Sequence, residues 1–231
     1  MDRAATLEQL ARLCRTGSEG MRAPDVEASG SASLDAVLPG GGWQVGSMVE
    51  MMPDAVGIGE LQLLMPALSR ISQSERYVAL ISPPFIPFPA ALSQHGLRLE
   101  HLLLIRADKP TDALWACEQA LRCRSFGAVI AWPATIKDKE VRRLQLAAEA
   151  GRSIGFLYRS TSAALEASPA ATRLRMKSNQ DGSLRVEILK CRGGRSGIAV
   201  TCLEKSPVVE KSPVAQLAPA VTHPAALAAC I

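Results

Sequence analysis

Residues 47–64 have the sequence Ser-Met-Val-Glu-Met-Met-Pro-Asp-Ala-Val-Gly-Ile-Gly-Glu-Leu-Gln-Leu-Leu. The apolar run at 47–51 is typical of a buried strand, and the run at 61–64 is typical of the start of a helix. A strand, a glycine-containing turn and a helix in this order form the setting of the phosphate-binding loop G-x-x-x-x-G-K-S/T. The stretch therefore predicts an α/β fold with this strand–turn–helix unit at its centre.

The chemical groups of a working phosphate-binding loop are missing from this turn. Gly57 keeps the second glycine, but Met52 stands at the first glycine, Ile58 at the lysine and Gly59 at the hydroxyl residue. The lysine contacts the outer phosphates and the hydroxyl binds Mg²⁺. We therefore interpret Met52, Gly57, Ile58 and Gly59 as a degenerate P-loop that is not expected to bind ATP.

Two carboxylates that such a site needs are also absent. The run at 80–82 is followed by Pro83-Pro84, and the run at 129–131 is followed by Trp132-Pro133. Mg²⁺ requires oxygen ligands and phosphoryl transfer requires charge neutralisation, which Pro84 and Trp132 do not supply at these former carboxylate positions. We predict a binding protein, not an enzyme, with no catalytic residue, cofactor or metal. Trp132 is expected to fill the vacated pocket; the alternative is an interface anchor.

Composition indicates one domain with additional ends. The chain has 231 residues, of which 48% are apolar and only 4% aromatic, so aliphatic side chains must fill the core. Its six cysteines form no CxxC pair and its three histidines lack zinc-site spacing. The sequence shows no apolar signal core and no 18-residue apolar run. We expect a cytoplasmic protein without membrane contact.

Alternating strands and helices predict a three-layer α/β fold with a mostly parallel sheet. A polar turn with Asp-Gly at 181–182 predicts a C-terminal β-hairpin. The expected strands are 48–52, 76–82, 102–106, 128–132, 153–158, 172–177, 184–190 and 198–203, and the expected helices are 59–71, 88–95, 111–122 and 137–150, with Thr111 as a helix cap and Gly151 as a helix end.

The two ends of the chain differ from this core. Leu7 and Leu10 belong to an apolar i, i+3, i+4, i+7 pattern, which predicts a short amphipathic helix that docks on its own domain or on a neighbour. A Pro- and Ala-rich composition predicts a disordered tail. We expect an N-terminal helix and the start of a linker at 1–22, a core at 23–204 and a tail at 205–231.

A basic stretch lies near the C-terminal end of the core. Residues 173–195 hold seven basic and two acidic side chains. Such a stretch can be a solvated hairpin face, a footprint for DNA phosphates or a contact for an acidic partner. The candidate contact residues are Leu7, Leu10, Arg173, Arg175, Lys177, Lys190, Arg192 and Arg195, of which Arg173, Arg175 and Lys177 are expected on one strand face.

The segment before the turn resembles the N-terminal part of the RecA core. It contains Gly-Ser-Ala-Ser-Leu-Asp at 30–35, Gly-Gly-Gly at 40–42 and the strand that feeds the loop. The segment after the turn, with Leu-Gln-Leu-Leu-Met-Pro-Ala-Leu at 61–68 and Ala-Val-Ile-Ala-Trp at 128–132, resembles the cell-division inhibitor SulA. In combination, the two halves resemble the ImuA family of RecA-like proteins.

The ImuA resemblance implies a non-catalytic adaptor of SOS-induced translesion DNA synthesis. Its implied partners are RecA, an ImuB-like inactive Y-family polymerase and an error-prone replicative-type DNA polymerase, with possible weak DNA binding and self-association. The alternative is a SulA-type inhibitor that binds the division GTPase FtsZ. The third hypothesis is a residual ATPase that binds its nucleotide through unusual ligands.

Overall fold

The structure is a computed structural model that describes residues 25–203. The predicted N-terminal helix, with Leu7 and Leu10, and the predicted tail at 205–231 lie outside the described residues. The boundaries of the three predicted segments therefore stay predictions. None of the helices between Asp25 and Leu203 is long and apolar enough to cross a membrane.

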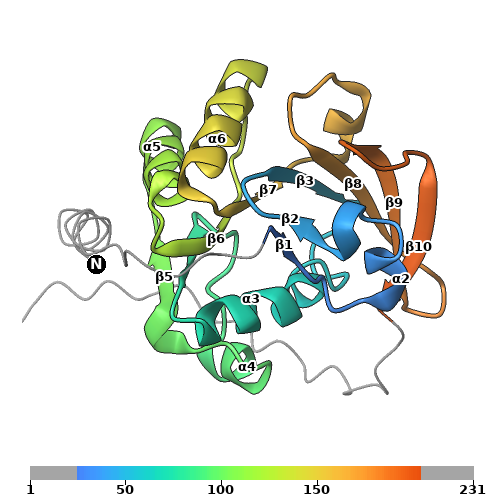
Figure 1. Cartoon of the computed structure of the whole chain (residues 1–231), viewed down its shortest axis with the longest axis horizontal. Coiled ribbons are helices and arrows are strands. Elements are labelled where there is room, and N and C mark those ends of the chain that lie inside the picture. Colours follow the sequence, from blue (N-terminus) through green and yellow to red (C-terminus); the bar gives the residue numbers. More distant parts are fainter. Residues whose placement is uncertain (1–24, 204–231) are drawn as a thin grey trace, which may run out of the picture.

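An eight-stranded sheet forms the centre of the molecule (Figure 1), with the order β10-β9-β8-β3-β7-β6-β4-β5. The pairs from β8 to β5 are parallel, and β9 runs antiparallel to both β8 and β10. The strands are β3 (Met48–Pro53), β4 (Tyr77–Ile81), β5 (Leu102–Ile105), β6 (Phe126–Ala131), β7 (Ile154–Tyr158), β8 (Thr172–Ser178), β9 (Leu184–Cys191) and β10 (Ile198–Leu203).

Helices cover both faces of this sheet. One core joins the sheet to α2, α3 and α4, and a second core joins its other face to α5 and α6. The two groups of helices lie on opposite sides of the strands in Figure 1. The helices are α2 (Ala32–Asp35), α3 (Met65–Gln73), α4 (Pro89–Gln94), α5 (Pro110–Arg122) and α6 (Asp138–Gly151), and the short 3-10 turns are η1 (Pro39–Gly41), η2 (Gln62–Leu64), η3 (Leu99–His101) and η4 (Thr161–Leu165).

Burial on both faces explains the uninterrupted apolar runs. In β4, Val78 and Leu80 join the core under α3, while Ala79 and Ile81 join the core under α5 and α6. Parallel strands covered on both faces need apolar residues at every position, not at alternate ones. The prediction of an α/β fold with a mostly parallel sheet is confirmed.

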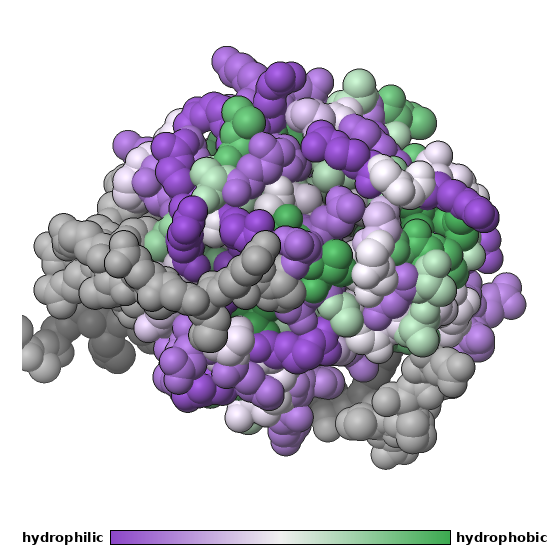
Figure 2. Space-filling model, viewed as in Figure 1, coloured by the Kyte–Doolittle hydropathy of each residue, from purple (hydrophilic) through white to green (hydrophobic). Residues whose placement is uncertain are grey.

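The antiparallel end of the sheet is covered differently. Leu174 and Met176 of β8 point into the core shared with α3, and Arg175 between them points the other way. A tight turn with Gly182 at a φ of 82° joins β8 to β9, as the Asp-Gly pair predicts. The C-terminal hairpin is therefore confirmed. Figure 2 shows this view of the surface as largely hydrophilic, with apolar residues gathered on the side of β9 and β10.

Three local predictions need correction. The helix expected from residue 59 begins later, because Gly59 has a φ of 98° and Pro66 occupies the first turn of α3. The start of α5 is at Pro110 with Lys109 as its cap, so Thr111 is already inside the helix. Gly151 is the last residue of α6, and Arg152 has the left-handed conformation that ends it.

A small antiparallel pair was not predicted. β1 (Val26–Glu27) pairs with β2 (Trp43–Gln44) next to the main sheet. Each strand has two residues, which is too short for a periodic pattern to be visible in the sequence. Trp43 is buried and meets Phe156 edge to face at 5.3 Å between ring centroids, so this pair closes the core under α3.

Candidate functional site

The turn between β3 and η2 is closed by one of its own carboxylates. The Gly57 amide donates hydrogen bonds to Glu60 Oε1 at 2.9 Å and to Glu60 Oε2 at 3.1 Å. Gly57 has a φ of 84°, a conformation that glycine adopts without strain. In a phosphate-binding loop such amides bind the anion. Here the Gly57 amide donates to a carboxylate of the protein itself, that of Glu60.

The other residues of the turn are apolar and packed. The Met52 side chain is fully buried in β3, and Ile58 packs against the core under α3. A Cβ atom on Gly59 would lie 3.0 Å from the side chain of Leu203 at the end of β10. Met52, Ile58 and Gly59 thus pack closely against neighbouring side chains.

An open groove of about 380 Å³ lies beside this turn. The residues that follow β3, β4, β6 and β7 line it, among them Val56, Pro84, Trp132 and Thr161. Pro84 and Trp132, which were predicted to stand at former carboxylate positions, therefore meet at one site with the turn after β3. This agrees with the general rule that the carboxyl ends of parallel strands face one crevice.

An aromatic pair lines one part of the groove. The rings of Trp132 and Tyr158 are parallel and their centroids lie 4.9 Å apart. The Tyr158 hydroxyl donates a hydrogen bond to the Glu60 carbonyl oxygen at 2.9 Å, which ties the pair to the turn. Burial, with the Glu60 charge as a second cause, raises the pKa of Tyr158 well above its usual value. Tyr158 is therefore a neutral donor at physiological pH.

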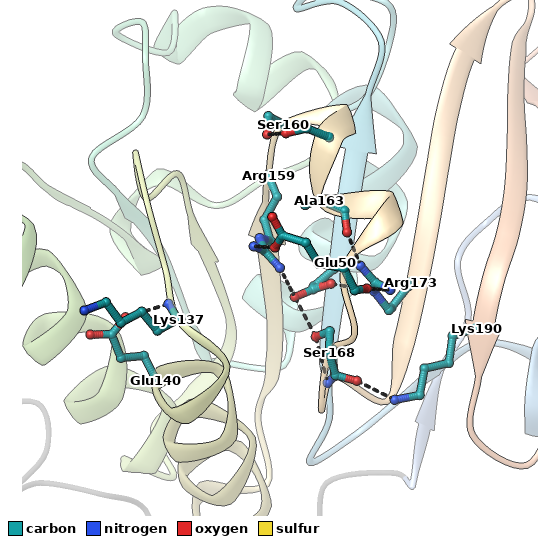
Figure 3. Close-up of polar contacts among 12 residues, drawn as sticks. Glu50, Lys137, Glu140, Arg159, Ser160, Ala163, Ser168, Arg173 and Lys190 are labelled. Carbon is teal, nitrogen blue, oxygen red and sulfur yellow. Dashed lines mark hydrogen bonds and ion pairs between the residues drawn. The ribbon is translucent and has the colours of Figure 1, made fainter.

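A buried charged network includes Arg159, which also lines the groove (Figure 3). Glu50 of β3 is fully buried and accepts hydrogen bonds from Arg159 at 3.0 Å, from Ser168 at 2.8 Å and from Arg173 at 2.7 Å. Two guanidinium groups and one hydroxyl thus compensate one carboxylate. Buried charges are tolerated when they are paired and hydrogen-bonded in this way.

The same network holds the segment between β7 and β8 in place. Arg173 also donates to the carbonyl oxygens of Ala163 and Glu166, and Arg159 pairs with the Glu166 carboxylate at 2.8 Å. Lys190 donates to the Ser168 carbonyl oxygen at 2.7 Å (Figure 3). The irregular backbone at one edge of the groove is therefore fixed from β8 and β9.

The predicted basic residues do not form one surface. Arg173, Arg175 and Lys177 share a strand face as predicted, but Arg173 is buried and paired with Glu50. Arg175 and Lys177 are partly exposed and lie 3.4 Å and 3.9 Å from Asp54. Arg192 and Arg195 are exposed in the turn between β9 and β10. Burial thus removes Arg173 from the surface candidates and leaves the others spread over two strands and a turn.

Sequence reasoning missed Glu50, Glu60 and Arg159. One signal was present, because a glutamate inside an apolar strand must find a buried partner. The identity of that partner was not visible, since Arg173 follows 123 positions later in the chain. Within residues 25–203, no group of three or more His, Cys, Asp or Glu side chains is placed to hold a metal ion.

The loop after β4 exposes large apolar side chains next to the groove. Phe85 is 68% exposed, Ile86 70% and Phe88 71%, and Pro84 directly before them lines the groove. Val56, in the turn after β3, is also exposed and lines the groove. This edge of the sheet therefore combines a groove with unpartnered apolar side chains.

The middle of the chain is similar to one known family. Residues 47–155 match the family model described as the cell division inhibitor SulA. The matched part begins just before β3 and ends in β7, and it includes the turn, Pro84 and Trp132. It spans somewhat less than half of the 231 residues.

Individual relatives agree with this match. The cell division inhibitor SulA of Edwardsiella piscicida is 34% identical over 95 residues, which are 41% of this chain and 56% of the relative. The proteins of the same name from Yersinia pestis and Yersinia pseudotuberculosis are 30% identical over 98 residues, which are 42% of this chain and 58% of each relative. The chain thus spans less than two thirds of the length of these relatives.

These matches correct the leading functional prediction. An adaptor of translesion DNA synthesis, with RecA, an ImuB-like protein and an error-prone polymerase as partners, was expected from the ImuA resemblance. That prediction is wrong, because the matched family and relatives are cell division inhibitors. They support the SulA resemblance, which covered the middle of the chain.

Proposed function

We propose that this chain is a cell division inhibitor of the SulA type, which acts by binding the division GTPase FtsZ. The observation that supports this most strongly is the family match over residues 47–155. That region supplies β3, β4, β5 and β6 and the helices between them, together with the turn and most of the groove residues. The part of the chain that is similar to an inhibitor is therefore also the part that builds the candidate site.

We further propose that the protein acts without catalysis. The Gly57 amide of the degenerate loop already donates to the Glu60 carboxylate. Met52 and Ile58 pack in the core, and Pro84 and Trp132 stand at the former carboxylate positions. These features support a loop whose phosphate chemistry has been replaced by packing. The descent of this turn from a P-loop and a RecA-like form of the sheet stay predictions in this proposal.

Inhibition by binding has a simple physical requirement. The chain must present a rigid surface that buries apolar area against FtsZ, since association without chemistry depends on contact free energy alone. A sheet covered on both faces and a loop segment fixed by a buried ion network provide that rigidity. The carboxyl ends of the parallel strands provide the exposed apolar side chains.

Overexpression in a rod-shaped bacterium tests the proposed function. We expect long undivided cells in which fluorescent FtsZ no longer forms rings, while DNA replication and segregation continue. The control is Leu80→Asp, which places an unpaired charge in the buried core to unfold the chain, and it is expected to leave division normal. Normal division and normal rings at a high level of the folded wild-type chain would contradict the proposal.

A further inference from the structure

The exposed apolar residues are concentrated at one edge of the sheet. Among residues 25–203, eight large apolar side chains are exposed. Five of them lie in the loops that follow the parallel strands β3, β4 and β7. These five are Val56, Phe85, Ile86, Phe88 and Leu165. Because the carboxyl ends of parallel strands meet at the same edge, the five belong to one side of the molecule. We call them, with the groove, the carboxyl-edge surface.

The loop after β4 presents its side chains in a restricted conformation. Prolines at 83, 84, 87 and 89 surround Phe85, Ile86 and Phe88, and each proline fixes its own φ. A restricted loop loses little conformational entropy when it binds. Exposed apolar side chains in a group mark interaction sites, whereas single ones are ordinary on a protein surface. This loop is therefore suited to enter an apolar depression on another protein.

The groove beside the loop has a negative and aromatic character. Asp54 and Glu60 line it together with Trp132 and Tyr158. The one basic residue among its lining side chains, Arg159, is already bound by Glu50 and Glu166. The Asp54 carboxylate oxygens lie 3.4 Å from Arg175 Nε and 3.9 Å from Lys177 Nζ, which are long distances for ion pairs. The groove is thus complementary to a cationic side chain, which carboxylates and aromatic rings both attract.

A phosphate or an acidic peptide does not fit this groove. The Gly57 amide of the turn already donates its hydrogen bonds to the Glu60 carboxylate. Two carboxylates in the lining would repel an added negative charge. The chemistry therefore selects a ligand that is apolar along the loop and positively charged in the groove.

We infer that the carboxyl-edge surface binds an apolar segment of FtsZ that carries a lysine or arginine side chain. Phe85, Ile86 and Phe88 are the apolar anchors, and the basic side chain enters the groove between Glu60 and Trp132. This inference rests on the proposed function for the identity of the partner. The exposed apolar side chains and the two carboxylates of the groove support the surface itself.

Binding of the full chain to purified FtsZ tests this inference. The test variants are Phe85→Ser with Ile86→Ser, and separately Glu60→Gln, which keeps an oxygen acceptor for the Gly57 amide but removes the charge. The matched controls are Leu146→Ser, an exposed leucine on α6, and Glu75→Gln, an exposed glutamate before β4 at the other edge of the sheet. Circular dichroism melts verify that all variants are folded.

We expect the serine pair to weaken binding at least about tenfold, the size of effect seen for interface anchors. Glu60→Gln should weaken binding several-fold and reduce its dependence on salt, because one screened charge pair is lost. Both controls should bind within about twofold of the wild type. Unchanged binding by the serine pair, or an equal loss in Leu146→Ser, would overturn the inference and leave the proposed function intact.

Two other results would also overturn the inference, and they differ in what they mean for the proposed function. If the wild-type chain does not bind FtsZ at all, the proposed function and the inference fall together. If the serine pair changes the oligomeric state in analytical ultracentrifugation while FtsZ binding persists, the surface pairs two copies of this chain and the inference is wrong.

Discussion

At the scale of single residues, the buried carboxylate of Glu50 connects β3 to the groove. It stands between Val49 and Met51 in an otherwise apolar strand, and two arginines compensate its charge. Replacing a buried ion network by apolar residues is often neutral, but removing one partner leaves an uncompensated charge. The network therefore fixes the loop at 159–171 as long as all its members are present.

Glu50→Gln is expected to destabilise the fold strongly. The change leaves the Arg159 and Arg173 guanidinium groups buried without their common anion, which costs about 3–5 kcal/mol of the free energy of unfolding. The control Arg175→Met removes a half-exposed ion pair with Asp54 and should cost under about 1 kcal/mol. Urea denaturation measures both values. Equal small losses in the two variants would contradict the assigned role of Glu50.

The buried Cys117 thiol makes the free energy of unfolding depend on pH in the alkaline range. Burial, with the Glu118 charge as a lesser cause, raises the pKa of the Cys117 thiol to about 12 from a usual value near 9.0. Above pH 9 the unfolded chain releases this proton and the folded chain keeps it, so stability falls as pH rises through this window. Between pH 9 and pH 10 the wild type should lose more unfolding free energy than Cys117→Ala, by at most about 1.4 kcal/mol. Parallel slopes in urea titrations of the two proteins would exclude this cause.

At the scale of elements, close backbone contact sets where α5 and α6 end. A Cβ atom on Gly151, the last residue of α6, would lie 2.0 Å from the Leu121 carbonyl oxygen of α5. Leu121 also accepts a hydrogen bond from the Ser153 hydroxyl at 2.7 Å, so this backbone is held in place from β7. The glycine is therefore present for space between two helices, since its own conformation is helical.

The stability of Gly151→Ala shows whether helix propensity or the contact between α5 and α6 dominates at this position. Helix propensity alone favours alanine by about 1 kcal/mol. The contact with fixed backbone requires a shift of α5 or α6, and overpacking of this kind costs about 1–3 kcal/mol. We expect a net loss of stability and a lower melting temperature. A variant as stable as the wild type would mean that the helix ends move freely.

Most elements could be predicted because their apolar runs are long. The runs in β4 and β6 are buried on both faces, so composition alone identifies them. The start of α3 could not be placed correctly, since the loop motif suggested a helix directly after Gly59 while Pro66 sets the first turn. The stack of Trp132 on Tyr158 and the pair of Glu50 with Arg173 join distant positions. No periodic pattern in one sequence reveals such contacts.

At the scale of the whole molecule, the sheet positions the loops that line one groove. Loops after β3, β4, β6 and β7 meet around one groove, and in the turn after β3 the Gly57 amide is bonded to Glu60. The loss of phosphate binding, which Met52, Ile58 and Gly59 indicate in the sequence, stays a prediction. The sequence did not single out the matched family, because resemblance in the segment before the turn pointed to one family while the matched region, 47–155, points to another.

Sedimentation of FtsZ polymers tests the central claim most directly. Purified FtsZ is assembled with GTP and centrifuged in the presence of increasing amounts of the full chain, without ATP. We expect the pelleted polymer and the GTP turnover to fall together as the chain approaches the concentration of FtsZ. Full pelleting and undiminished GTP turnover in a molar excess of the folded chain would contradict the account.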